Sequence, residues 1–198
     1  MLVTRRKIGQ ISTMQAAVNR DFVSVADYLA AEEASQGRHE YLGGLVYAKA
    51  GETLAHNRIS QNLLFNLHAR TKGRPCRMFI SDVLVNLHLR TDEYYYYPDI
   101  FVTCDKRDKH PQFVQYPKLI IEVLSESTER VDKREKFFAY TSIASLEEYV
   151  LGAQSVKEVT VFRRASQWKA ETLSGAKAKV TLASLKLTVP LAAIYERV

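Results

Sequence analysis

The chain has 198 residues and a formal net charge of +6, with 46% hydrophobic and 25% charged residues. These values are typical of a globular protein and exclude a low-complexity chain. No apolar run approaches the roughly 18 residues that a membrane-spanning helix needs. The first ten residues, MLVTRRKIGQ, also lack the apolar stretch of a secretion signal. We therefore expect a cytoplasmic protein that does not contact a membrane.

The positive charge is concentrated at the two ends of the chain. Residues 1–20 carry four basic and no acidic side chains, residues 21–150 carry 16 basic and 19 acidic, and residues 151–198 carry eight basic and three acidic. The sign of the net charge therefore gives no support for a nucleic-acid-binding function. We expect residues 1–20 to form a basic, poorly ordered tail, because chain ends tend to fray. Residues 21–198 are expected to form a single domain.

The elements predicted along the chain alternate between helices and short strands. Ser24 and Asp27 have the spacing of a capping box at a helix start, and two short strands within 38–49 flank the Gly43-Gly44 turn. Further segments follow from apolar periodicity: a long helix over 53–70, strands at 77–80, 83–88, 94–104 and 118–124, a helix over 131–142, strands at 148–151, 158–163 and 168–172, and a short helix opened by Pro190. This order predicts a mixed β-sheet flanked by helices, of the α/β or α+β class.

The cysteines give no sign of a covalent framework. Cys76 and Cys104 stand 28 positions apart, and the chain has no C-x-x-C pair. A zinc knuckle or a disulfide scaffold is therefore not expected. We predict reduced thiols, with Cys104 buried in the core.

Glu122 is an acid inside a strongly apolar strand. It lies in Leu119–Leu124, and period-two alternation puts it on one face with Ile120 and Leu124. A carboxylate at such a position is costly unless it is paired, hydrogen-bonded or bound to a metal. The alternative is a glutamate near the strand end that faces outward.

Asp99 is a second acid in an apolar setting. It follows Pro98 and precedes Ile100-Phe101-Val102, and proline marks a strand edge, start or bulge. A plain turn or bulge residue is the alternative. The polar segment 105–116 would let the strands on either side pair, which brings Asp99 close to Glu122. Two such carboxylates repel each other, and a hard divalent cation, Mg²⁺ or Mn²⁺, is the usual remedy.

The helix predicted after Glu122 carries a charged stripe. Asp132, Lys136 and Tyr140 fall on one side at 100° per residue, with Lys133 about 60° away, while Val131 and Phe138 mark the side expected to be buried. Such a stripe is usually a solvated face. Its position directly after the strand would also let a lysine face an anionic substrate.

Other polar residues have weaker assignments. His56, near the start of the long helix, is a candidate substrate contact, and a helix cap or a hydrogen-bonded histidine is the alternative. Asp82 interrupts a strand and is either a bulge residue or a residue close to the site. Residues 94–97, all tyrosines, could stack on bases, but packing and edge structure is the interpretation that we favour.

Together these motifs resemble a known family. The tyrosine-rich strand, PDIFVTCD, PKLIIEVLSEST, the D-x-x-x-K of 132–136 and SLEEYVL are similar to the Uma-type restriction-endonuclease-like family, within the PD-(D/E)XK nuclease superfamily. The hairpin RHEYLGGLVYA and the helix AHNRISQNLL agree as well. The resemblance covers the chain from about Ser24 to Tyr195.

The resemblance implies a restriction-endonuclease-like fold and a set of site residues. Asp99 and Glu122 match the metal-binding acids of the motif, and Glu40 matches an acid early in the fold. Leu124 occupies the position of the motif lysine. In related nucleases this lysine can lie on the following helix, which would match Lys136, with Lys133 as the fallback.

The implied activity is metal-dependent hydrolysis of nucleic acid, with DNA as the expected substrate. Asp99, Glu122 and the backbone carbonyl of Val123 would hold Mg²⁺ or Mn²⁺, and Glu40 would bind it through water. Lys136 would orient water or offset transition-state charge, and Tyr140 is a weaker substrate contact. Two alternatives remain: a non-catalytic nucleic-acid- or protein-binding module, and a hydrolase of another phosphoester. A homodimer is compatible with cutting both strands.

Overall fold

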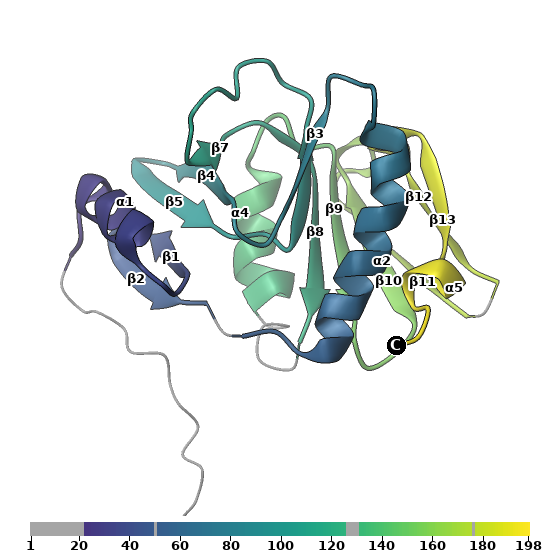
Figure 1. The fold of residues 1–198 in the computed structure, drawn as a ribbon. Coiled ribbons are helices and arrows are strands. Elements are labelled where there is room, and N and C mark those ends of the chain that lie inside the picture. Colours follow the sequence, from purple (N-terminus) through teal and green to yellow (C-terminus); the bar gives the residue numbers. More distant parts are fainter. Residues whose placement is uncertain (1–21, 50, 126–130, 176) are drawn as a thin grey trace, which may run out of the picture.

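The computed structural model describes residues 22–49, 51–125, 131–175 and 177–198 (Figure 1). The tail predicted over residues 1–20 lies outside these ranges. The helices are α1 (Val25–Ala34), α2 (Leu54–Thr71), α4 (Phe137–Thr141) and α5 (Leu191–Ile194). A π-helical turn covers Asp132–Lys136, and 3₁₀ turns cover Arg164–Ser166 and Ala183–Leu185. The strands are β1 (His39–Leu42), β2 (Leu45–Ala48), β3 (Arg77–Ile80), β4 (Leu84–Leu89), β5 (Asp92–Tyr96), β6 (Ile100–Thr103), β7 (Phe113–Val114), β8 (Pro117–Leu124), β9 (Glu148–Ala153), β10 (Glu158–Arg163), β11 (Ala170–Ser174), β12 (Lys179–Leu182) and β13 (Leu187–Pro190).

A mixed six-stranded sheet is the centre of the fold. Its strand order is β11-β10-β9-β8-β6-β3. Strands β8 and β9 are parallel, whereas the other neighbours are antiparallel. The pairing of β6 with β8, which the sequence predicted, aligns Ile100 with Ile121. Asp99 therefore lies just before the start of β6, beside Glu122 of β8.

The two faces of this sheet are covered by different elements (Figure 1). On one face α2, α5 and the β12–β13 hairpin pack on Ile121, Val123 and neighbouring residues. On the other face Ile120 and Leu124 pack with α4 and with β4 and β5 of a second sheet. That sheet has the order β2-β1-β5-β4-β7. The alternation predicted for β8 is confirmed, since apolar residues of both its faces are buried in different cores.

Two predicted helix starts are confirmed by their caps. The Ser24 side chain accepts a hydrogen bond from the Asp27 backbone N–H (3.2 Å) and donates one to the Asp27 carboxylate (2.6 Å). At α2, the hydroxyl of Thr53 accepts a hydrogen bond from the backbone N–H of His56 (3.0 Å). These side chains satisfy N–H groups that lack partners in the first helical turn.

Some predicted elements are wrong in detail. The strand predicted over 94–104 is two strands in different sheets, β5 and β6, because Pro98 cannot donate a ladder hydrogen bond. Strands β7, β12 and β13 had no predicted counterpart. Phe138, expected on the buried side of its helix, is 70% exposed. The side that carries Asp132 and Lys136 is the buried one, so the solvated-stripe alternative is also wrong.

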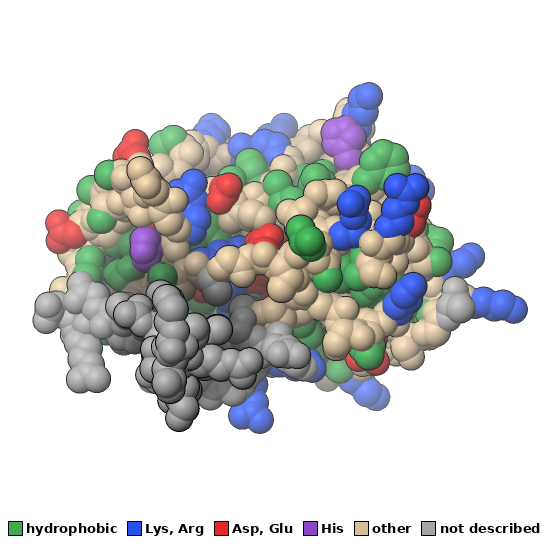
Figure 2. Space-filling model, turned by 60° about the horizontal axis from the view of Figure 1, so that its bottom comes forward, with side chains coloured by type: hydrophobic (Ala, Val, Ile, Leu, Met, Phe, Trp, Pro, Cys, Tyr) green, Lys and Arg blue, Asp and Glu red, His purple; other side chains and the backbone are tan. Residues whose placement is uncertain are grey.

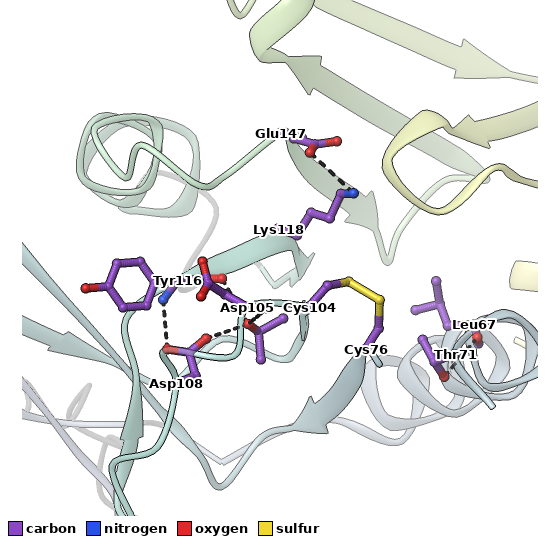
Figure 3. The surroundings of a disulfide bond; sticks show 10 residues. Leu67, Thr71, Cys76, Cys104, Asp105, Asp108, Tyr116, Lys118 and Glu147 are labelled. Carbon is purple, nitrogen blue, oxygen red and sulfur yellow. Dashed lines mark hydrogen bonds and ion pairs between the residues drawn. A yellow bond between two sulfur atoms is a disulfide. The ribbon is translucent and has the colours of Figure 1, made fainter. Parts of the chain in front are cut away.

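The prediction of reduced thiols is wrong as well. Cys76 and Cys104 form a disulfide between the start of β3 and the end of β6, beside α2 (Figure 3). These strands are antiparallel neighbours with Arg77 opposite Thr103, so the cysteines face each other with Cα atoms 4.0 Å apart. A separation of 28 residues in sequence concealed this proximity.

The basic side chains of the described ranges can be followed on one face of the molecule. On the face drawn in Figure 2, Lys and Arg side chains are spread over the surface rather than gathered in one patch. Within the same ranges, no helix is both long enough and apolar enough to cross a membrane.

Candidate active site

Two buried acids meet where β6 begins beside β8. The backbone N–H of Asp99 donates to Glu122 Oε2 (3.0 Å), and Asp99 Oδ2 accepts from the backbone N–H of Val123 (2.7 Å). Asp99 is 4% exposed and Glu122 is 2% exposed. Pro98 lies where the chain leaves the sheet of β5 and enters the sheet of β6. Because proline cannot donate a ladder hydrogen bond, β5 ends before it, and Asp99 lies at the junction of the two sheets. The outward-facing alternative for Glu122 is therefore wrong, whereas Asp99 lies in a bend, as its alternative allowed, with its side chain buried.

Lys136 lies among three carboxylates that come from three elements. Its Nζ is 3.1 Å from Glu40 Oε1 of β1, 3.3 Å from Glu122 Oε1 of β8 and 3.5 Å from Asp132 Oδ1 one turn earlier. Its side chain is only 8% exposed. Lys133, the fallback lysine, is exposed and lies outside the described lining of the cavity below. Leu124, at the motif's lysine position, is packed in the apolar core.

Tyr140 is a hydrogen-bond donor to Glu122. Its hydroxyl donates a hydrogen bond to Glu122 Oε1 (3.0 Å), and its side chain is fully buried. The cavity described below is lined by Glu122 and Lys136 but not, among the described residues, by Tyr140. Tyr140 therefore binds Glu122 without being part of that described lining, and its role as a substrate contact stays a prediction.

A second group of polar residues surrounds Asp99, and the sequence analysis found only one of them. His56 Nε2 lies 2.8 Å from Asp99 Oδ2, and Lys49 Nζ lies 3.3 Å from Asp99 Oδ1. Lys49 Nζ also donates to the carbonyl of Tyr97 (3.3 Å) and lies 3.6 Å from Glu52 Oε1. Lys49 and Glu52 belong to the link between β2 and α2, where charged residues are too common to signal a site.

The electrostatics of the site reflect burial and crowding of like charges. Burial, and then the negative charge of Glu122, raise the pKa of Asp99 well above its usual range. Burial alone would lower the pKa of Lys136, but Glu122, Glu40 and Asp132 raise it well above the usual value. Burial lowers the pKa of His56. The lysine is therefore held as a cation, whereas the histidine is held neutral.

These residues line one cavity of about 570 Å³. Its described lining includes six carboxylates and two ammonium groups, from Glu40, Glu52, Asp99, Glu122, Asp132, Glu135, Lys49 and Lys136. His56 and Val123 line it as well. The cavity thus brings together Glu40, Asp99, Glu122, Lys136 and His56, five of the residues that the sequence analysis singled out.

Two other candidates lie outside the described cavity lining. Asp82 pairs with Arg38 at the surface (3.2 Å), and Tyr95 packs in the apolar cluster with Tyr28 and Tyr41. Tyr96 packs edge-on against Tyr140 and also lines the cavity.

The fold and this buried acidic site define a restriction-endonuclease-like protein. The family model Uma2, described as "Putative restriction endonuclease", matches residues 25–192. The chain therefore belongs to the Uma2 family, a nuclease-like family, as the motifs predicted. A solved structure described as "a putative nuclease belonging to DUF820 from Anabaena variabilis" has the same fold, with a TM-score of 0.73 and 18% identity. The match covers 87% of this chain and 97% of that one.

Two proteins of Synechocystis sp. are similar in sequence. "Uncharacterized protein slr1290" is 35% identical over 143 residues, which is 72% of this chain and 74% of that protein. "Uncharacterized protein sll1609" is 31% identical over 179 residues, which is 88% of this chain and 100% of that protein.

Proposed function

We propose that this protein is a Mg²⁺- or Mn²⁺-dependent endonuclease that hydrolyses phosphodiester bonds of nucleic acid, with DNA as the substrate. The observation that carries the proposal is the convergence of Asp99, Glu122 and Lys136 at one cavity, together with Glu40. Membership of the nuclease-like Uma2 family supports the same reaction class.

The residues of the cavity fit a hard divalent cation. Six carboxylates face two ammonium groups in the described lining, and the raised pKa of Asp99 reflects that uncompensated negative charge as well as burial. Carboxylate and carbonyl oxygens are the ligands that Mg²⁺ and Mn²⁺ prefer. Asp99, Glu122 and the carbonyl of Val123 would hold the ion, with Glu40 bound through water. When bound, such an ion supplies Lewis acidity toward the scissile phosphate and the attacking water.

Lys136 supplies the fixed positive charge of the site. It fills the role of the missing lysine at position 124, since its Nζ reaches Glu122 from the following helix. A charge held in a buried setting stabilises developing negative charge without reorganising solvent. In this proposal Lys136 donates a hydrogen bond to the phosphate or to the attacking water, and Tyr140 keeps Glu122 in position.

The experiment is a cleavage assay on purified full-length chain. Supercoiled plasmid, single-stranded DNA, linear duplex DNA and structured RNA are incubated with MgCl₂, MnCl₂ or EDTA. We expect metal-dependent nicking or cutting of DNA. Asp99→Ala serves as the control that excludes a contaminating nuclease, and Glu33→Gln, at an exposed position of α1, serves as a matched acid variant that should cleave like wild type.

Two results reject the catalytic proposal. One is the survival of every substrate with either metal, and the other is cleavage that Asp99→Ala retains. DNA binding that is independent of metal and unchanged in Glu122→Gln favours a non-catalytic binding module. The dependence of binding on salt concentration then shows whether phosphates are contacted at all. Homodimerisation and a cytoplasmic location stay predictions, which sedimentation and cell fractionation test.

A further inference from the structure

The cavity has a second group of metal-ligating side chains beside the one just described. One ligand atom from each of Glu52, His56 and Asp99 can be chosen so that all three lie within 4.8 Å of one another. In the site proposed above, Asp99 acts together with Glu122 and Val123. The second group shares Asp99 but lies on the side of the cavity formed by α2 and the β2–α2 link.

His56 is fixed firmly enough to act as a ligand. It lies in the first turn of α2, where its backbone N–H is bound by the cap residue Thr53 (3.0 Å), and it is 5% exposed. Its Nε2 is 2.8 Å from Asp99 Oδ2. Two cis ligands of an octahedral ion with 2.1 Å bonds lie about 3 Å apart, so these atoms are spaced as neighbouring ligands would be.

The other ring nitrogen points to the same conclusion. His56 Nδ1 is buried and makes no hydrogen bond within the described ranges, although Glu52 Oε2 is 3.2 Å away. A buried polar atom without a hydrogen bond is costly, and a bound ion is one of the explanations for such an atom in a folded protein. The imidazole therefore stands between two carboxylates with one nitrogen toward each.

The ammonium group of Lys49 lies between the carboxylates of Asp99 and Glu52. Its Nζ lies 3.3 Å from Asp99 Oδ1 and 3.6 Å from Glu52 Oε1. The same two carboxylates that face the imidazole are thus bridged by an ammonium group. A divalent ion at this point would replace Lys49, so Lys49 would weaken its binding.

We propose that Glu52, His56 and Asp99 form a second cation position that takes first-row transition-metal ions in preference to Mg²⁺. Imidazole nitrogen binds transition metals well, whereas Mg²⁺ requires oxygen ligands. Two ions that share Asp99 would form a two-metal centre at the phosphate. The inference rests on the proposed function for the ion at Glu122. The ligands of the second position, Glu52 and His56, are tested separately.

The test is a Mn²⁺ titration of the full-length chain, followed by electron paramagnetic resonance, with Mg²⁺ as competitor. Wild type should bind two Mn²⁺ ions, and Mg²⁺ should displace only one readily. Glu52→Gln and His56→Gln should each lower the affinity for the second ion at least about tenfold. Lys49→Met should raise that affinity. Glu33→Gln and His68→Gln, an exposed position on the same helix, are matched controls and should titrate like wild type.

The variants also separate this inference from the proposed function. Glu122→Gln should lose the first ion and keep the second. If wild type binds one ion that Glu122→Gln removes, or if Glu52→Gln and His56→Gln both titrate like wild type, the second position is rejected and the Glu122 site stands. If Glu122→Gln loses neither ion while His56→Gln loses one, the second position stands and the proposed catalytic site is rejected. Thermal unfolding of each variant, followed by circular dichroism, shows that the protein titrated is folded, and Lys49→Met tests the position without removing a ligand.

Discussion

Two glutamates on neighbouring strands are both buried, and their surroundings differ in kind. Glu122 of β8 is 2% exposed and Glu148 of β9 is 1% exposed. Glu148 accepts hydrogen bonds from Arg163 Nε (3.0 Å), from the backbone N–H groups of Ala183 (3.0 Å) and Ser184 (2.9 Å), and from the Ser184 hydroxyl (2.5 Å). Its charge is compensated by donors, and it fastens the Ala183–Leu185 turn to the central sheet.

Glu122 is held by fewer donors and lies among other acids. It accepts from Lys136, Tyr140 and the backbone of Asp99, and it lines a cavity with five other described carboxylates. A buried acid in an apolar strand therefore does not identify a site by itself. An excess of acids around an accessible cavity distinguishes the functional carboxylate from the structural one.

The largest expected effect is the loss of cleavage activity in the variant Glu122→Gln. This change keeps the size of the side chain and removes a charge that the proposed ion needs, so cleavage should fall by about a thousandfold, or roughly 4 kcal/mol of transition-state stabilisation. Plasmid nicking rates in MnCl₂ measure it. Circular dichroism should show an unchanged fold, and a rate within tenfold of wild type would contradict the assignment of Glu122.

Glu148→Ala should instead act on stability. Removing one partner of a buried ion pair leaves Arg163 without its buried acceptor and costs about 3–5 kcal/mol. Urea unfolding measures this loss. The folded fraction should still bind Mn²⁺ with wild-type affinity, and a loss of metal binding without a loss of stability would reverse the two roles.

Lys136→Met tests whether a metal ion can replace the positive charge that lies beside Glu122. Without the ammonium group, Glu40, Glu122 and Asp132 lose a cation that lies within 3.5 Å of each, so the free energy of unfolding in EDTA should fall by about 3 kcal/mol. Added Mn²⁺ should restore part of that loss, because it supplies positive charge to the same carboxylates. The matched variant Arg163→Met should be destabilised with no recovery in Mn²⁺, and equal recovery in both variants would show a nonspecific effect.

The smallest expected effect is on stability at alkaline pH, and it comes from Tyr195, a buried residue of the core. Burial raises the pKa of Tyr195 to about 12, against about 10 in the unfolded chain. Above pH 10 the unfolded state loses this proton while the folded state keeps it, so stability falls between pH 10 and 12. The free energy of unfolding of Tyr195→Phe should fall less steeply over this range. Identical slopes for variant and wild type would show that Tyr195 contributes nothing to the alkaline loss.

Much of the fold and several of the residues that line the cavity were predictable from local patterns. Asp99 and Glu122 were recognisable because each interrupts an apolar strand, and Lys136 because it shares a helix face with Asp132. Lys49 and Glu52 were not, since a charged residue in a connecting segment carries no periodic signal. Their position depends on the path from β2 to α2, which is a tertiary property.

Two errors have a common cause. Residues 94–104 looked like one strand because both halves are rich in aromatic and β-branched residues, and only Pro98 marked the change of sheet. The disulfide between Cys76 and Cys104 depends on β3 pairing with β6, which no spacing in the sequence reveals. In both cases local composition indicates a strand, whereas the partner of each strand depends on the order of strands in the whole sheet.

In the proposed function, Glu122 and Asp99 form a cation-binding site and Glu148 does not. The most direct measurement is anomalous diffraction near the manganese edge from crystals soaked in MnCl₂. We expect a peak within ligand distance of the carboxylates of Asp99 and Glu122, and none beside Glu148. A soaked crystal without a peak at Asp99 and Glu122, or with the strongest peak at Glu148, would contradict the proposed function.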